Sequence, residues 1–196
     1  VEIMEIDCSL DGPSGAALPP FRKTMKTRLE RTCAAVRASK LPRITAVVIA
    51  CHGWRTSLQI GLQNTAQSID AFVSALRGPA RDADNRPIDS RLGEHLVVFL
   101  AACAAGTGGP TGDRSVADEL RDGLCAQGVV RCSVHAHTTD GHAFENPFVR
   151  VFYGAGSRVP LNGGVYLVAP RSQMWKTWVR GLKARTDPDP SHPLRY

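Results

Sequence analysis

The run Val47-Val48-Ile49-Ala50-Cys51-His52-Gly53 and the run Val97-Val98-Phe99-Leu100-Ala101-Ala102-Cys103 decide the fold of this chain. Continuous apolar runs of this length are typical of strands in a parallel sheet that is covered on both faces. Each run carries a reactive side chain at or next to its last residue, His52 in the first and Cys103 in the second. We therefore predict two neighbouring buried strands that deliver an imidazole and a thiol to one edge of a sheet.

Helical patterns separate the apolar runs, so that strands and helices alternate along the chain. Between the two runs, Ile69, Phe72, Val73 and Leu76 recur at helical spacing up to Gly78. This alternation predicts an α/β fold, a three-layer α/β/α sandwich with a mostly parallel sheet and helices on both faces. The predicted strands cover residues 1–6, 44–51, 95–103, 129–138 and 165–169, and the predicted helices 21–39, 69–76, 115–127 and 174–182, with a polar surface loop over 78–93.

The length and charge of the chain limit its organisation and its partners. With 196 residues it fits one domain, which we place at residues 1–185, followed by a flexible tail over 186–196. The net charge is +6, and basic residues concentrate in 21–40, where they alternate with acidic and apolar positions and lack flanking aromatic residues. We interpret them as a solvated helix face and expect no nucleic-acid partner. We expect no membrane partner either, because the longest apolar run is too short to span a bilayer. Because the first residue is Val1, we expect this domain to be part of a larger polypeptide.

The cysteines indicate a reduced protein. No C-x-x-C pair occurs, which excludes a zinc ribbon and a thioredoxin-type motif. Most of the cysteines lie on apolar helix faces or in apolar runs, so we predict free thiols, a cytoplasmic location and no cofactor. The six positions are Cys8, Cys33, Cys51, Cys103, Cys125 and Cys132.

The pairing of His52 with Cys103 has a chemical reason. A thiol with its ordinary pKa of about 8.5 is mostly protonated at neutral pH, and an adjacent imidazole can accept its proton and create a nucleophile. Gly53 allows the backbone to approach a bound carbonyl closely. The N–H groups of Gly53 and Cys103 are candidates for stabilising a tetrahedral oxyanion.

These motifs resemble the CHAT group of caspase-like peptidases, which is similar to this chain over roughly residues 40–155. Ala50-Cys51-His52-Gly53 resembles the group's strand end that carries the catalytic histidine, and Leu100-Ala101-Ala102-Cys103 resembles the one that carries the nucleophile. The resemblance implies a caspase-haemoglobinase fold and a cysteine endopeptidase that cuts a protein or peptide substrate. In it, His52 accepts the proton, Cys103 attacks, Gly53 donates to the oxyanion and Asp140 binds a basic substrate side chain. It also implies a helix over Phe148 to Tyr153.

Two other functions stay open. In the segment His135-Ala136-His137-Thr138-Thr139-Asp140-Gly141-His142, the first two histidines share one face of a strand, a common geometry for zinc ligands, and Asp140 or His142 supplies a third. This predicts a zinc-dependent hydrolase. The other alternative is a non-catalytic pseudo-peptidase that binds partners through residues 21–40 and 78–93.

Overall fold

The computed structural model describes most of the chain up to Tyr153 and short segments after it. All structural statements below concern the described residues, which are 3–7, 21–39, 41, 43–78, 80–81, 87–88, 90–107, 114–129, 131–140, 148–154, 158–161, 164–167 and 194–195.

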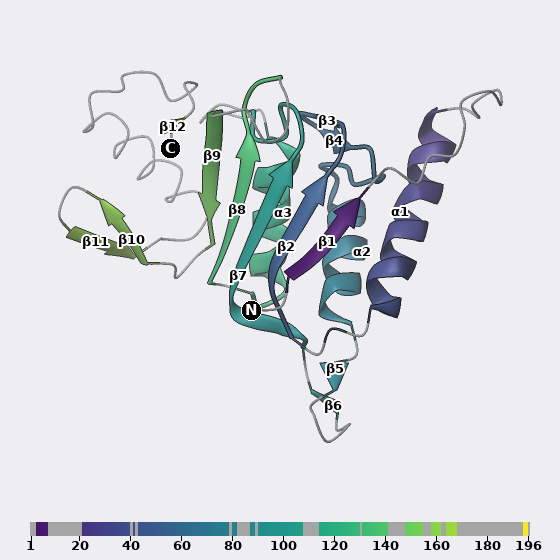
Figure 1. Ribbon diagram of the computed structural model, residues 1–196, viewed down its shortest axis with the longest axis horizontal. Helices are drawn as coiled ribbons and strands as arrows, with labels where there is room; N and C mark the ends of the chain where they lie inside the picture. The colour runs from purple at the N-terminus through teal and green to yellow at the C-terminus, as the bar shows by residue number, and fades with distance from the viewer. Residues whose placement is uncertain are drawn as a thin grey trace.

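A six-stranded sheet forms the centre of the molecule, in the order β1-β2-β7-β8-β9-β12 (Figure 1). Its first four strands run parallel, β9 is antiparallel to β8, and β12 is antiparallel to β9. The sheet strands are β1 (Ile3–Asp7), β2 (Ile44–Ala50), β7 (Leu92–Ala101), β8 (Cys132–His137), β9 (Phe148–Tyr153) and β12 (Leu194–Arg195). Three hairpins lie outside the sheet, namely β3 (Gly53–Trp54) with β4 (Ser57–Leu58), β5 (Ala80–Arg81) with β6 (Pro87–Ile88), and β10 (Arg158–Leu161) with β11 (Gly164–Leu167).

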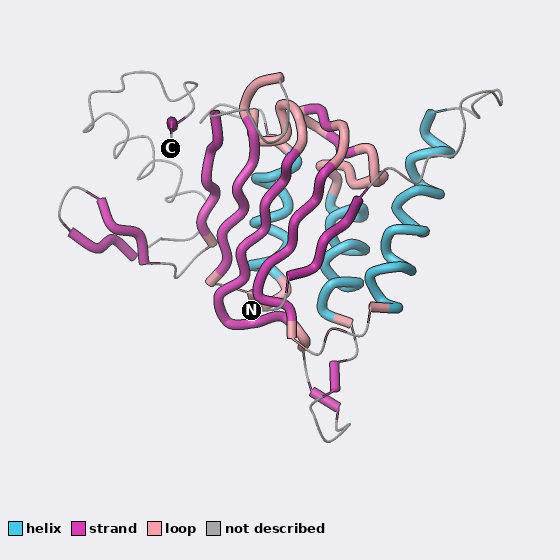
Figure 2. The backbone as a smooth tube through the Cα atoms, viewed as in Figure 1, coloured by secondary structure: helices cyan, strands magenta, loops and turns pink. Residues whose placement is uncertain are grey.

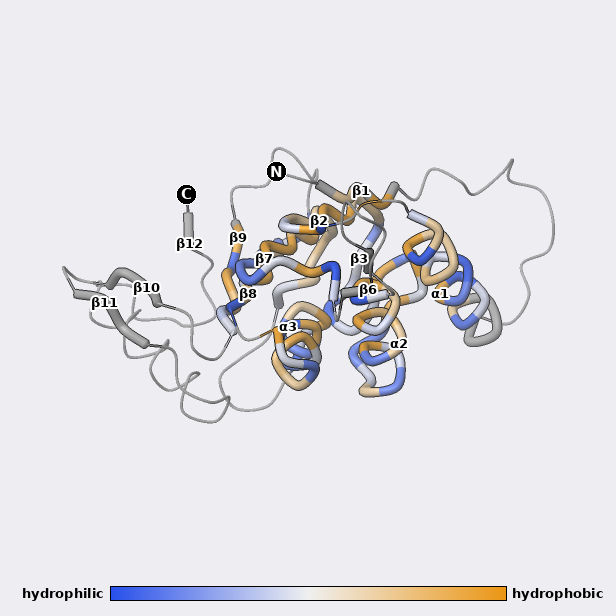
Figure 3. The backbone as a smooth tube through the Cα atoms, turned by 90° about the horizontal axis from the view of Figure 1, so that it is seen from below, coloured by the Kyte–Doolittle hydropathy of each residue, from blue (hydrophilic) through white to orange (hydrophobic). Residues whose placement is uncertain are grey.

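Three helices connect the parallel strands, and all of them cover the same face of the sheet (Figure 3). They are α1 (Phe21–Ala38), α2 (Ala66–Arg77) and α3 (Val116–Ala126). Each strand of the series β1, β2, β7, β8 is added on the same side of the previous one. Because crossovers between parallel strands are right-handed, a sheet that grows in one direction places all its crossover helices on one face.

The hydrophobic core lies between this helical layer and the sheet. Alternate residues of the central strands, such as Val47 and Ile49 of β2, point into it and are fully buried. Phe72 and Leu76 of α2 and Leu120 of α3 pack into the same core. On the opposite face the strand residues are less buried, and Val97 of β7 is 43% exposed.

The helix ends follow the signals in the sequence. The Thr65 hydroxyl accepts a hydrogen bond from the Ser68 N–H at the start of α2, and Gly78 closes that helix with φ 31°. The Ser115 hydroxyl accepts from the Asp118 N–H at the start of α3, and Gly128 follows its end with φ 89°. The start and the end predicted for α3 are therefore confirmed. No helix among the described residues is long and apolar enough to span a membrane.

The segment Phe148 to Tyr153 corrects the sequence prediction, because it forms strand β9 and not a helix. Its residues are aromatic and β-branched around a single arginine, a composition that suits a strand. It pairs antiparallel with β8, from His137↔Val149 to Ser133↔Tyr153. The resemblance to a helical segment was therefore wrong here, since the local residues favour an extended backbone.

Other parts of the prediction change in extent or lie outside the described residues. β7 begins at Leu92 and ends at Ala101, so Cys103 lies two residues beyond the strand. The segment predicted as a last strand pairs with β10 in a separate hairpin, and Leu194–Arg195 of the predicted tail pairs with β9. The predicted helix over residues 174–182 lies outside the described residues, and in the part of the chain that the structure describes one helical layer is present.

Arg91 joins the ends of two helices to the start of β7. Its side chain is 3% exposed, although the sequence predicted a polar surface loop here. Its Nη2 donates to the carbonyls of Val36 (2.6 Å) and Ala75 (2.8 Å). Its Nε donates to the Leu76 carbonyl (2.7 Å), and its Nη1 donates to the Ser39 carbonyl (3.1 Å). The guanidinium thus caps the carboxyl ends of α1 and α2 together, where helices leave carbonyls unpaired and carry partial negative charge.

Replacing Arg91 should destabilise the fold strongly. We expect Arg91→Ala to lower the free energy of unfolding by about 3 kcal/mol or more, because buried carbonyls of two helices lose a charged donor. Arg91→Lys should recover only part of this loss, since an ammonium cannot present the planar fork of a guanidinium. Urea unfolding measures both. Arg131→Lys, at an exposed arginine before β8, is the matched control and should change stability by less than about 0.5 kcal/mol. Equal effects of the two lysine variants would contradict the capping role.

Candidate functional site

The segments that carry His52 and Cys103 leave the sheet at the carboxyl edge of its parallel strands, and this edge lies at the top of Figure 2. β2 and β7 are direct neighbours, as predicted, and Ala50 pairs with Ala101 at their ends. His52 and Cys103 each follow two residues after this pair. Because paired strands lie about 4.8 Å apart, the chain segments that carry the imidazole and the thiol leave the sheet side by side.

Gly53 brings the two segments into backbone contact. A Cβ added at Gly53 would lie 2.7 Å from the Cβ of Ala102 and 2.8 Å from the carbonyl oxygen of Cys103. Real Cβ atoms do not tolerate such distances, so the close approach requires glycine at this position. The residue after His52 therefore lies directly against the backbone of Cys103.

The β3–β4 hairpin fixes the backbone around His52. The N–H of His52 donates to the side-chain Oε1 of Gln59 (3.2 Å), and the N–H of Gln59 donates to the His52 carbonyl (2.9 Å). The His52 side chain itself is exposed. Sequence reasoning missed Gln59, because only the hairpin register brings it opposite His52.

The same register determines where the Gly53 N–H points. Gly53 pairs with Leu58, and the bond from Gln59 to His52 marks this as a pair that does not exchange backbone hydrogen bonds. The N–H of Gly53 is therefore directed away from β4. It is not used by the ladder of the hairpin, which an oxyanion donor requires.

Cys103 lies in a turn that is tied to the end of β8. The next residue, Ala104, has φ 53°, a left-handed conformation that is uncommon for a residue with a side chain. Its N–H donates to the Thr139 carbonyl (3.2 Å), and the Gly106 N–H donates to the His137 carbonyl (2.7 Å). The Thr107 hydroxyl donates to the Thr138 carbonyl (2.7 Å). These bonds hold the turn in a conformation that an isolated chain would rarely adopt.

The start of α3 holds both halves of the site. The Ala117 N–H donates to the Ala105 carbonyl (3.2 Å) in the turn after Cys103, and the Val116 N–H donates to the Arg55 carbonyl (2.7 Å) in the β3–β4 hairpin. The first N–H groups of a helix lack partners within the helix. Here they bind the turn that contains Cys103, which we call the cysteine turn, and the β3–β4 hairpin to the same helix, α3.

Two exposed side chains border this edge. Asp140 follows Thr139, whose carbonyl binds the N–H next to Cys103, so the backbone of Asp140 lies close to the cysteine turn. Trp54 is 51% exposed in the hairpin two residues after His52. Sequence reasoning did not single out Trp54, because its exposure depends on the hairpin.

The predicted zinc ligands do not form a cluster among the described residues. His135 and His137 share one face of β8, but Nε2 of His135 lies 3.1 Å from the Ser133 hydroxyl, and the buried ring of His137 packs edge-on against Phe99. In the described part of the chain no three His, Cys, Asp or Glu side chains come together as metal ligands. The candidate ligand His142 lies outside the described residues.

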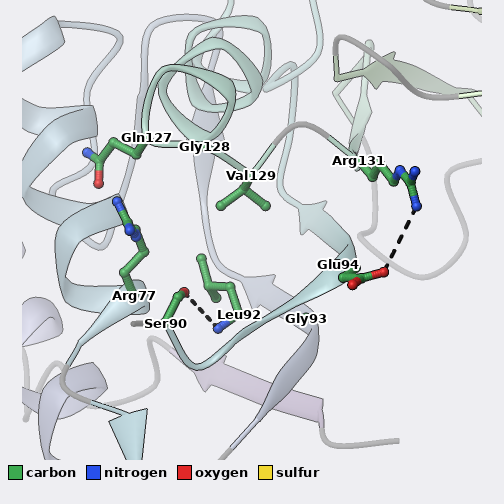
Figure 4. A pocket seen from close by; sticks show the side chains of 9 residues that line it. All are labelled: Arg77, Ser90, Leu92, Gly93, Glu94, Gln127, Gly128, Val129 and Arg131. Carbon is green, nitrogen blue, oxygen red and sulfur yellow. Dashed lines mark hydrogen bonds and ion pairs between the residues drawn. The ribbon is translucent and has the colours of Figure 1, made fainter. Parts of the chain in front are cut away.

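A pocket of about 480 Å³ lies at the opposite, amino edge of the sheet (Figure 4). Leu92 and Val129 line it between two arginines, Arg77 at the end of α2 and Arg131 before β8. Arg131 pairs with Glu94 at 3.9 Å. This pocket is separate from the edge that carries His52 and Cys103.

Comparison of this chain with models of known protein families, with curated proteins and with solved structures finds no match. The candidate site therefore stands on its own geometry.

Gly53→Ala tests the backbone contact at the site. The added Cβ would push against Ala102 and Cys103, so we expect a loss of about 1–3 kcal/mol in the free energy of unfolding and an altered rate of Cys103 alkylation by iodoacetamide. Gly128→Ala is the control, because a Cβ there meets nothing within 4 Å and costs only the strain of φ 89°. It should lose about 1–2 kcal/mol and leave the alkylation rate unchanged. An unchanged rate in Gly53→Ala would disprove the contact.

His135 makes stability depend on pH. Burial lowers the pKa of His135 from its ordinary value of 6.5. Below pH 6.5 the unfolded chain binds a proton at His135 more readily than the folded chain does, so the free energy of unfolding falls as the pH drops below that value. Urea unfolding at pH 7.5 and 5.5 measures how much the free energy of unfolding falls between the two pH values. This acid loss should be smaller in His135→Gln than in the unaltered protein. His95→Gln, at an exposed histidine of β7, should keep the full loss. Equal acid losses in all three proteins would refute this assignment.

Proposed function

We propose that this chain is a caspase-like cysteine endopeptidase that cuts a protein substrate with His52 and Cys103. The observation that carries the proposal is the register of β2 and β7, in which Ala50 pairs with Ala101 and both reactive residues follow two positions later. The contact of Gly53 with the Cys103 backbone supports it, because it keeps the two segments together.

The chemistry follows from the two groups. His52 accepts the proton of the Cys103 thiol, and the sulfur attacks the carbonyl carbon of the scissile peptide bond. The tetrahedral intermediate collapses to a thioester as His52 gives its proton to the leaving amine. Water then hydrolyses the thioester, with His52 again as the base, and restores the thiol. The exposed position of His52 supports this role, since both substrate and water must reach it.

Four further groups have roles in the proposed mechanism. The N–H groups of Gly53 and Cys103 stabilise the oxyanion, and the direction of the Gly53 N–H, away from β4, supports this assignment. Asp140 binds a basic side chain of the substrate next to the cleaved bond. Its exposure and its place beside the cysteine turn support that role. Trp54 offers the substrate an exposed aromatic surface beside His52.

The proposal includes a caspase-like three-layer sandwich over residues 1–185 and a cytoplasmic setting. The parallel strands β1, β2, β7 and β8 support the first part, and α1, α2 and α3 supply one of the two helical layers that such a sandwich has. The reduced thiols of Cys33, Cys51, Cys103, Cys125 and Cys132 support the second, because thiols persist in reducing compartments.

A peptide library and a peptide-based electrophile test the proposal. We expect cleavage after basic residues, loss of at least about 1,000-fold of the activity in Cys103→Ala and in His52→Ala, and labelling of Cys103 ahead of the other cysteines. Both variants should keep the unfolding midpoint of the parent, since these side chains lie at the edge of the sheet. Cys125→Ser, at a half-buried thiol elsewhere, is the control and should cleave normally.

Other outcomes of this test overturn the proposal. Cleavage that survives in Cys103→Ala would exclude the cysteine mechanism, and its loss on treatment with a chelator would favour the zinc hydrolase. Equal reactivity of Cys103 and the buried Cys33 would favour the non-catalytic interaction module.

A further inference from the structure

Cys125 and Cys132 place two thiols in contact at the far end of α3. Cys125 lies in the last turn of the helix, Cys132 is the first residue of β8, and their Sγ atoms are 4.0 Å apart. Cys132 is 2% exposed, whereas Cys125 is half-buried. Cys125 is thus the more accessible residue of the pair, and Cys132 is shielded from solvent.

The separation suits a disulfide. A disulfide bond brings the two sulfurs to about 2.05 Å, and rotation of cysteine side chains about Cα–Cβ supplies movements of this size. The two residues are joined by a short connection through Gln127, Gly128 and Val129, so the helix end and the strand start stay close in any case. The disulfide would therefore link two segments that local backbone hydrogen bonds already hold close together.

We propose that Cys125 and Cys132 form a redox-active dithiol, a modification site that a small-molecule disulfide such as oxidised glutathione converts into an internal disulfide. The Cys125 thiolate attacks one sulfur of the reagent, which forms a mixed disulfide and releases one thiolate. The Cys132 sulfur then attacks Cys125 and displaces the second thiolate. Two protein thiols are oxidised, one small-molecule disulfide is reduced to two thiols, and the two protons pass to those thiols.

The order of the two attacks follows from the environment of each sulfur. Cys125 attacks first because it is accessible. The hydrogen bond with Cys125, together with burial, raises the pKa of the Cys132 thiol, so Cys132 stays protonated until its neighbour has reacted. The buried thiol is shielded from reagents in solution. Once Cys125 is bound in the mixed disulfide, Cys132 gives its proton to the departing glutathione thiolate and attacks the Cys125 sulfur as a thiolate.

The disulfide would link α3 covalently to β8. These are the two elements that hold the cysteine turn at the other edge of the sheet. It would also fix the connection whose residues Gln127, Gly128 and Val129 line the pocket of Figure 4. Oxidation therefore changes the mobility of one wall of that pocket. The inference does not depend on the proposed peptidase activity, because it concerns neither His52 nor Cys103.

Trypsin mapping tests the dithiol directly. Arg131 lies between the two cysteines, so trypsin places them in separate peptides, residues 122–131 and 132–150. After the folded full chain has been treated with oxidised glutathione, we expect these peptides as one linked species that dithiothreitol separates. We also expect the oxidised protein to unfold at a higher urea concentration than the reduced protein, since the link constrains the unfolded chain.

Variants make the test decisive. Cys125→Ser should remove the linked species and abolish the rise in the urea midpoint, whereas Cys33→Ser, at a buried thiol on α1, should keep both. A trivalent monoarsenical, which binds two adjacent thiols, should protect Cys125 and Cys132 from alkylation in Cys33→Ser and leave Cys132 unbound in Cys125→Ser. Absence of the linked peptides, a glutathione adduct that persists on Cys125, or arsenical binding unaffected by Cys125→Ser would overturn the proposal.

Discussion

The hydrogen bonds of the Arg91 guanidinium to the carboxyl ends of α1 and α2 hold the helical layer against the sheet. A helix end buried without partners for its carbonyls is unfavourable, and two such ends lie side by side here. A single planar cation satisfies both, and its charge opposes the partial negative charge of the two helix ends. The backbone of Arg91 also bonds to Ile44 at the start of β2 and precedes β7 directly. The two strands that lead to the candidate site, β2 and β7, thus both begin next to Arg91.

At the other edge of the sheet the constraint comes from backbone groups. The turn after Cys103 receives hydrogen-bond partners from the end of β8 and from the start of α3, and the hairpin after His52 is bonded to the same helix start. The left-handed Ala104 shows that the turn is held by its surroundings and not by local preference. A nucleophile in a fixed turn loses little conformational freedom when it binds substrate, which favours the proposed catalysis.

The sequence predicted the positions of His52 and Cys103, because these depend only on which strands are neighbours in the sheet. Consecutive strands that are joined through one helix run parallel and mostly lie side by side. β2 and β7 are such neighbours, so the segments of His52 and Cys103 leave the sheet at one edge. The prediction failed for Phe148 to Tyr153, where a family resemblance outweighed the local pattern. It also missed Arg91, because arginine is rarely fully buried and the partners of this one are main-chain carbonyls that no side-chain pattern reveals.

By itself the sequence determined the α/β class, the carboxyl end of α2, both ends of α3 and the residues that lead out of the central strands. These follow from hydrophobic periodicity and capping side chains, which act over a few residues. Only the tertiary structure decided which face the helices cover, that the Gln59 side chain holds the His52 backbone and that Cys125 contacts Cys132. These features join segments through backbone hydrogen bonds and close packing, and such contacts depend on strand order and register, which no local sequence pattern specifies.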